Sequence, residues 1–119
     1  MNTIHDYIAV FDSGVGGISV LKHLVRLLPE ERFLYFGDSA NAPYGTRPTE
    51  EVRALTLAAA EKLYGAYPVK ALVVACNTAT AAAIHILRET YPDRIIVGIE
   101  PAVKLAADLH PKGRIGVMA

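Results

Sequence analysis

Three segments with chemically capable side chains each follow directly on a short apolar run. The segment 12–17 follows the first run, 37–46 follows the second, and 76–78 follows the third. They carry carboxylates, hydroxyls, a tyrosine and a thiol, which are groups that transfer protons or hold small polar ligands. In open α/β sheets, ligands bind beyond the carboxyl ends of the strands. We therefore expect the three segments to meet at one edge of a sheet.

Cys76 is the most reactive candidate among these residues. It is the single cysteine of the chain, so it forms no internal disulfide, and a reducing, cytoplasmic setting fits. Its place between an apolar run and a predicted helix would set it against the positive end of that helix, which favours a thiolate. Asn77 and Thr78 add donors for a substrate carboxylate. The alternative is that Cys76 is a small buried apolar residue.

Asp12 opens a glycine-rich loop that matches no nucleotide-binding motif. Gly14, Gly16 and Gly17 do not make G-x-G-x-x-G because position 19 is a serine, and no Gly-Lys-Ser/Thr ending follows. At the start of a helix, the loop's N–H groups could hold a carboxylate. The alternative is a tight turn that needs glycine. A carboxylate at the end of a buried strand is costly without partners, so Asp12 favours a functional site.

The remaining polar candidates are weaker. Pro43, Tyr44 and Gly45 either line a pocket or form an ordinary surface loop, within a stretch dense in turn-forming residues. We interpret Asp38 as a turn residue rather than as support for its neighbours. The histidines have no metal-ligand spacing on a shared face, so we expect them to be structural or solvated and expect no metal site; they are His5, His23, His85 and His110.

The elements that must position these residues alternate between strand and helix. Apolar runs predict strands at 7–11, 33–36, 69–75, 95–99 and 114–118. Helical spacing predicts helices between them, one with an apolar stripe from Ile18 to Leu28, one capped by Thr49, and one capped by Asn77 or Thr78. A short helix should begin at Glu100. This order predicts the α/β class, a parallel sheet with helices on both faces.

Composition excludes several classes of protein. The chain has 119 residues, is 52% hydrophobic and has zero formal net charge, which argues against disorder and against a basic nucleic-acid-binding surface. No apolar run reaches the roughly 18 residues of a membrane helix, and the N-terminus lacks the pattern of a signal peptide. Because the chain stops at Ala119, directly after an apolar strand, we expect it to be the first part of a longer protein.

Several motifs together carry a family resemblance. The segments are Ile8–Gly17, Tyr35–Asp38, Pro43–Thr46, Ala75–Ala79 and Ile99–Pro101. In this order and at this spacing they closely resemble bacterial glutamate racemase, over essentially the whole chain. The resemblance implies a cofactor-independent enzyme that interconverts L- and D-glutamate and supplies D-glutamate for peptidoglycan, the cell-wall polymer.

The resemblance also implies residue roles. In the family, two cysteines stand on opposite faces of the α-carbon: one takes the proton and the other returns one. Cys76 matches the first of them, and Asp12 matches an aspartate that assists it or binds the substrate amine. Further matches fall on substrate-binding positions, namely Ser13, Pro43, Tyr44, Gly45, Asn77 and Thr78.

The family pattern further implies how the chain is divided. Residues 1–99 would be the first of two α/β domains, without the C-terminal helices that return to it, and residues 100–119 would begin the second. The second cysteine, with its threonine and histidine, would lie beyond residue 119. We therefore expect these 119 residues alone to be inactive, and family members often form homodimers.

Two other interpretations stay open. One remains in the same superfamily, as an aspartate or hydantoin racemase or a related decarboxylase. The other is a small non-catalytic binding module with a flavodoxin-like topology, in which Cys76 is inert.

Overall fold

The fold alternates strands and helices through most of the chain. The computed structural model describes residues 6–14, 16–99 and 112. Its strands and helices, in chain order, are β1 (Tyr7–Asp12), α1 (Ile18–Leu27), β2 (Arg32–Gly37), α2 (Thr49–Ala66), β3 (Val69–Val74), α3 (Asn77–Thr90) and β4 (Ile95–Gly98). The helix expected from Glu100 and the strand expected at 114–118 lie outside the described residues.

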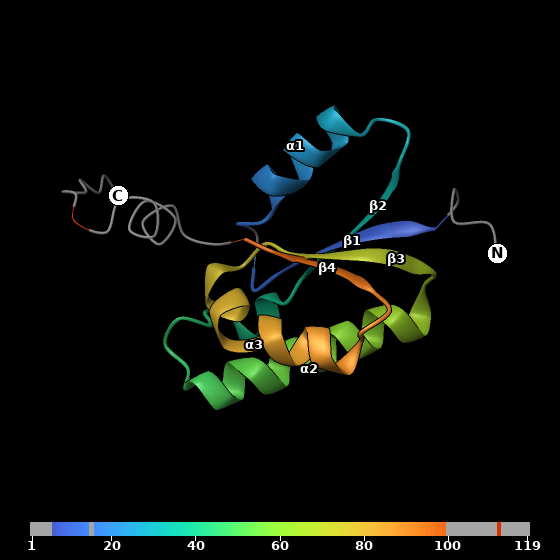
Figure 1. Ribbon diagram of the computed structural model, residues 1–119. Coiled ribbons are helices and arrows are strands. Elements are labelled where there is room, and N and C mark those ends of the chain that lie inside the picture. The colour runs from blue at the N-terminus through green and yellow to red at the C-terminus, as the bar shows by residue number, and fades with distance from the viewer. Residues whose placement is uncertain (1–5, 15, 100–111, 113–119) are drawn as a thin grey trace.

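The four strands form one parallel sheet in the order β2-β1-β3-β4. Helix α1 lies on one face of this sheet, and α2 and α3 lie on the other (Figure 1). The predicted α/β class, with a parallel sheet and helices on both faces, is therefore confirmed. The order places β1 and β3 side by side at the centre, where Phe11 pairs with Val74.

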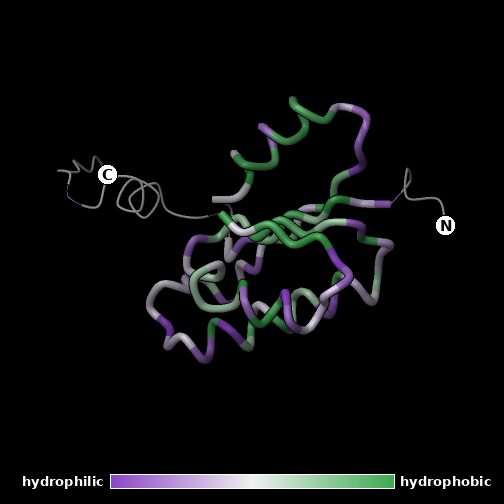
Figure 2. The backbone as a smooth tube through the Cα atoms, viewed as in Figure 1, coloured by the Kyte–Doolittle hydropathy of each residue, from purple (hydrophilic) through white to green (hydrophobic). Residues whose placement is uncertain are grey.

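Most of the buried apolar side chains lie between the sheet and the helices α2 and α3. Apolar residues concentrate along the central strands, and polar ones on the outer sides of these helices (Figure 2). Every second residue of β1, such as Ala9 and Phe11, enters this core. The other face holds a smaller cluster, in which Ile8, Val10 and Val73 pack against half-buried residues of α1. Both faces of the central strands are thus covered, as their continuous apolar runs require.

Both predicted helix caps were wrong. Thr49 is the first residue of α2, and its N-cap position is taken by Pro48, which makes no side-chain cap. At α3 the cap is neither Asn77 nor Thr78 but Cys76, whose sulfur accepts a hydrogen bond from the Ala79 N–H. The position of a cap depends on where the chain leaves the preceding strand. Because β3 ends at Val74, α3 begins at Asn77, so Asn77 is the first helical residue and not the cap.

The predicted apolar stripe of α1 is only partly covered. None of its residues is buried, and Ile18, Val25 and Leu28 are exposed. On the same face of the sheet, the β4 side chains Ile95 and Val97 are also exposed. The periodicity predicted the helix correctly, but α1 lies against the β1 and β2 side of the sheet, so the rest of this face has no cover among the described residues.

Among the helices that the structure describes, none combines the length and the apolar character that a membrane crossing needs.

Candidate active site

The chemically capable side chains gather at the topological switch point of the sheet, between β1 and β3. From β1 the chain passes to β2 on one side, and the next crossover brings β3 to the other side of β1. The crevice outside the carboxyl ends of two such strands is the usual ligand site of open α/β folds. Asp12 ends β1, and Cys76 follows β3 by two residues. The structure therefore brings the first and third predicted segments to the same crevice.

The glycine-rich loop holds the carboxylate of Asp12. Asp12 is only 6% exposed. Its Oδ2 accepts a hydrogen bond from the Gly17 N–H at 2.9 Å and a longer one from the Gly14 N–H at 3.3 Å. A Cβ on Gly17 would stand 2.9 Å from the Asp12 Cβ, so glycine is needed there for close approach. The loop N–H groups that could hold a ligand carboxylate thus satisfy a buried carboxylate of the protein itself.

Tyr35, on β2, fixes the other side of this loop. Its hydroxyl donates a hydrogen bond to the Gly14 carbonyl oxygen at 2.8 Å. Burial raises the pKa of Tyr35, and the negative charge of Asp12 raises it further. The hydroxyl therefore keeps its proton and remains a donor. The sequence analysis assigned Tyr35 no role, because a tyrosine within a predicted strand is usually a core residue. Its position two residues before Gly37 was the one sign that it lies near the end of the strand.

The sulfur of Cys76 lies between Ser13 and the start of α3. Cys76 is 7% exposed, and its thiol lies 3.6 Å from the Ser13 hydroxyl oxygen, within the hydrogen-bond range of sulfur. The Ala79 N–H points at the sulfur from 3.4 Å. This N–H and the N-terminus of α3 set positive partial charge against the sulfur. Cys76 thus packs with the core on one side and meets polar groups on the other.

The first turn of α3 offers two further donors. The first N–H groups of a helix have no partner within it. The Ala79 N–H is used by Cys76, and the Thr80 N–H by the Cys76 carbonyl oxygen. The N–H groups of Asn77 and Thr78 have no protein partner within the part of the chain that the structure describes. These two N–H groups lie next to the Cys76 thiol and could bind a substrate carboxylate.

Tyr44 carries the second predicted segment into the buried cluster that also contains Cys76 and Ala79. Tyr44 is 1% exposed, and its ring lies 6.1 Å from that of Phe11. Its hydroxyl donates to Asp38 Oδ2 at 2.6 Å. Asp38 also accepts from the Asn41 side-chain amide, so its preferred interpretation as a simple turn residue was wrong: it supports its neighbours. The segment between Asp38 and Tyr44 includes a single 3-10 turn and a cis peptide bond before Pro43.

The environment of Tyr44 keeps its hydroxyl protonated. Burial raises its pKa most, the hydrogen bond and charge of Asp38 raise it further, and the charge of Cys76 adds to this, against a smaller lowering by Arg47. Tyr44 and Cys76 belong to the same cluster of buried residues, so the predicted tyrosine and the predicted cysteine lie in one packed region.

A consequence for stability follows at alkaline pH. In the unfolded chain Tyr44 ionises near its ordinary pKa of about 10, whereas in the folded chain it resists ionisation. The raised pKa therefore stabilises the fold below pH 10, and that stabilisation falls as the pH rises toward the folded value. We expect Tyr44→Phe to flatten the fall in urea midpoint between pH 9 and 11, measured by circular dichroism. An equally steep fall in Tyr44→Phe would contradict this origin.

The other predicted residues lie around this crevice with looser contacts. A Cβ on Gly45 would lie 4.0 Å from the Thr78 hydroxyl oxygen, so the loop passes beside α3. Pro43 and Asn77 are exposed, although Asn77 directly follows Cys76 in the chain. His23 and His85 are exposed on helices, whereas His5 and His110 lie outside the described residues. The described part of the chain contains no metal-binding cluster.

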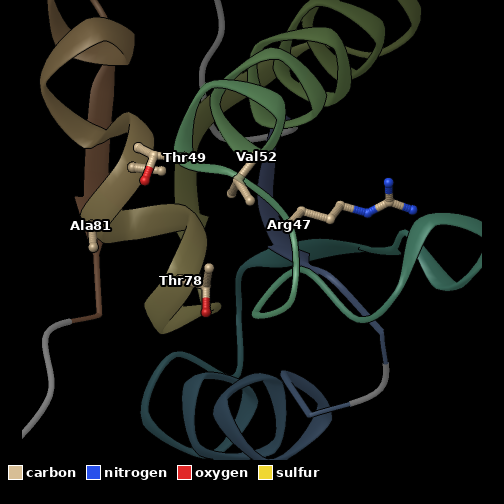
Figure 3. Close-up of a pocket in the computed structure, with 6 residues that line it drawn as sticks. Arg47, Thr49, Val52, Thr78 and Ala81 are labelled. Atoms are coloured by element: carbon tan, nitrogen blue, oxygen red, sulfur yellow. The ribbon is translucent and has the colours of Figure 1, made fainter.

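A pocket of about 310 Å³ adjoins the site between α2 and α3. Thr78 is the predicted site residue that lines it, with Thr49 and Val52 of α2 and Ala81 of α3 among the other lining residues (Figure 3). The Arg47 side chain extends away from Thr78 (Figure 3). It forms an ion pair with Glu51. The pocket therefore extends the Thr78 side of the crevice and does not enclose Cys76.

The sequence is closely similar to the N-terminal portion of glutamate racemases. It is 59% identical, over 112 residues, to the glutamate racemase of Clostridium novyi, an alignment that covers 94% of this chain and 43% of that protein. The chain thus spans less than half the length of the curated relatives it matches. No family model matches the chain.

Solved structures agree with the sequence match. The glutamate racemase of Escherichia coli, crystallised with L-glutamate and the activator UDP-MurNAc-ala, superposes with a TM-score of 0.80 at 38% identity, covering 88% of this chain and 39% of that one. That of Francisella tularensis, in complex with D-glutamate, superposes with a TM-score of 0.78 at 33% identity, covering 92% of this chain and 40% of that one.

Proposed function

We propose that this chain forms the first part of a glutamate racemase and that Cys76 is the base on one face of the substrate. The observation that carries the proposal is the position of the Cys76 sulfur, 3.6 Å from the Ser13 hydroxyl at the ends of β1 and β3. The relatives and solved structures to which the chain is similar support the same activity.

The proposed reaction needs no group beyond proton donors and acceptors. The Cys76 thiolate removes the α-hydrogen of glutamate as a proton and becomes a thiol, and the electron pair left on the α-carbon spreads into the carboxylate. A proton donor on the opposite face then completes the inversion. In this proposal that donor is a second cysteine; the chain itself has one cysteine, so the proposal assigns the second to the rest of the complete protein.

The described residues can stabilise the charge that develops. Fixed donors aimed at a developing anion are among the largest contributions to catalysis. The N–H groups of Asn77 and Thr78 and the hydroxyl of Ser13 are such donors here. Asp12 is already held by Gly14 and Gly17, so it stands as a fixed negative charge suited to the substrate ammonium group or to assisting Cys76. Pro43, Tyr44 and Gly45 supply the wall beside Thr78.

We also propose that residues 1–99 are the first domain and that later helices of the whole protein cover its open face. Exposed apolar residues support this: Ile18 and Val25 of α1, Leu28 directly after it, and Ile95 and Val97 of β4. Large apolar side chains exposed on one side of a sheet are characteristic of an interface. Residues 100–119 would begin the second domain. The substrate is glutamate, the location is cytoplasmic and the assembled enzyme is a homodimer in this proposal.

The test compares the protein made from its complete reading frame with the 119-residue chain. We expect the complete protein to racemise glutamate in both directions and aspartate at least about 100-fold more slowly, since a shorter side chain leaves fixed polar groups unpaired. The 119-residue chain should be inactive and should bind an apolar dye more strongly. Preference for aspartate or a hydantoin would assign another racemase, and inactivity of the complete protein on all three would favour a binding module.

A further inference from the structure

We propose that Asp38 is a positioning residue, whose carboxylate clamps the loop between β2 and α2 so that Tyr44 and Gly45 stand beside Cys76 and Thr78. The activity measured below rests on the proposed function, and the clamp itself does not. Asp38 is not among the residues expected to touch the substrate, so its role would act through its neighbours.

The carboxylate of Asp38 gathers two donors from its own loop. Tyr44 Oη donates to Oδ2 at 2.6 Å, and Asn41 Nδ2 lies 3.0 Å from both carboxylate oxygens. Hydrogen bonds to an ionised acceptor are shorter and about twice as strong as neutral ones. Asp38 therefore fixes the loop at two points, three and six residues along the chain.

The backbone of Asp38 ties the same loop to the central strand. Its N–H donates to the Asp12 carbonyl oxygen at 2.9 Å. The far end of the loop is closed by Arg47, whose backbone N–H donates to the Tyr44 carbonyl oxygen and whose Nε donates to that of Asn41. Asp38 is thus the point at which the loop joins the sheet edge that carries Asp12.

The clamped loop reaches the candidate active site through two residues. Tyr44 packs in the same buried cluster as Cys76, against Phe11. Gly45 passes close to Thr78. The Tyr44 hydroxyl is held by Asp38, and the residue packs in the buried cluster that contains Cys76. Losing the clamp would free this wall of the crevice without removing any group that touches the reacting atoms.

The activity test uses Asp38→Ala and Asp38→Asn in the complete protein. We expect Asp38→Ala to raise KM for glutamate on the order of 10–100-fold with a much smaller change in kcat, because misplaced binding groups cost about this much. Asp38→Asn keeps one acceptor oxygen for Tyr44 and should recover most of the loss. Asp93→Ala, an exposed aspartate in the turn before β4, is the matched control and should leave KM unchanged.

A double variant tests whether Asp38 acts through Tyr44. If it does, Tyr44→Phe in the Asp38→Ala background should add much less to KM than it does alone, since the hydroxyl has already lost its acceptor. Independent, multiplying effects would overturn the proposal. So would a lower melting temperature in Asp38→Ala with an unchanged KM, which is the behaviour of a residue that only stabilises the fold.

A local measurement separates failure of the clamp from failure of the proposed function. In the complete protein, Asp38→Ala should speed alkylation of Cys76 by iodoacetamide about tenfold, read on the Cys76 peptide by mass spectrometry, because freeing the loop uncovers a sulfur that is now 7% exposed. Far-ultraviolet circular dichroism checks that the variant is folded. Should Asp38→Ala not fold, Tyr44→Phe carries the same test, because it removes the hydroxyl that Asp38 holds. An unchanged alkylation rate of Cys76 overturns the clamp, whether or not the complete protein racemises glutamate.

Discussion

Cys76→Ser in the complete protein is expected to lower the rate of glutamate racemisation at least about 10³-fold, within the range that a positioned general base supplies. A serine hydroxyl is a far weaker proton acceptor at neutral pH than a thiolate. The rate is measured by the change in optical rotation of L-glutamate. Racemisation at the wild-type rate in this variant would remove Cys76 from the mechanism.

The same substitution should leave the fold intact, because Cys76 is also the N-cap of α3. Its sulfur accepts from the Ala79 N–H, and serine is a better N-cap acceptor of similar size. Cys76→Ala is the matched variant: it should be as inactive as Cys76→Ser but less stable by about 1 kcal/mol, because the cap is lost. Equal unfolding midpoints for the two variants would contradict the capping role.

Gly37→Ala is expected to destabilise the fold by about 3 kcal/mol, at the upper end of the cost of overpacking. A Cβ at this position would stand 2.1 Å from the Gly14 carbonyl oxygen, which is backbone and cannot swing aside. The same oxygen accepts the hydrogen bond of Tyr35. The strain therefore falls on the loop that holds Asp12. Urea unfolding followed by circular dichroism measures the change.

Gly65→Ala is the matched control for that prediction. Gly65 lies near the end of α2, and a Cβ there would meet nothing within 4 Å. Alanine is favoured over glycine inside a helix by about 0.5–1 kcal/mol. Gly65→Ala should therefore stabilise the same protein that Gly37→Ala destabilises. A similar small effect of both substitutions would show that Gly14 yields easily to a Cβ at Gly37.

Sequence reasoning placed Asp12 and Cys76 well because their positions depend on the strands alone. A parallel sheet brings the carboxyl ends of its strands to one edge, so a residue that follows a buried run must lie there. The alternation of apolar runs and helical spacing was enough for this. The same reasoning could not choose between a reactive and an inert Cys76, since that depends on contacts with Ser13 from a distant part of the chain.

The features that sequence reasoning missed depend on tertiary contacts. Asp38 reads locally as a turn residue, and only the return of the loop brings Tyr44 to its carboxylate. The N-cap of α3 was missed because cysteine is rarely considered a cap, and polar neighbours offered more familiar candidates. The exposed stripe of α1 has the same periodicity as a buried one. Periodicity shows that one side of a helix is apolar, but it does not show which element covers that side.

The exchange of the α-hydrogen of glutamate with solvent tests the central claim most directly. In D₂O, the complete protein should place deuterium at the α-carbon of glutamate as it racemises it. Proton NMR measures this as the loss of the α-proton signal. The account predicts that this exchange, started from the enantiomer whose hydrogen faces Cys76, disappears in Cys76→Ser. Exchange at the wild-type rate in Cys76→Ser, with the variant folded, would show that another group removes the proton.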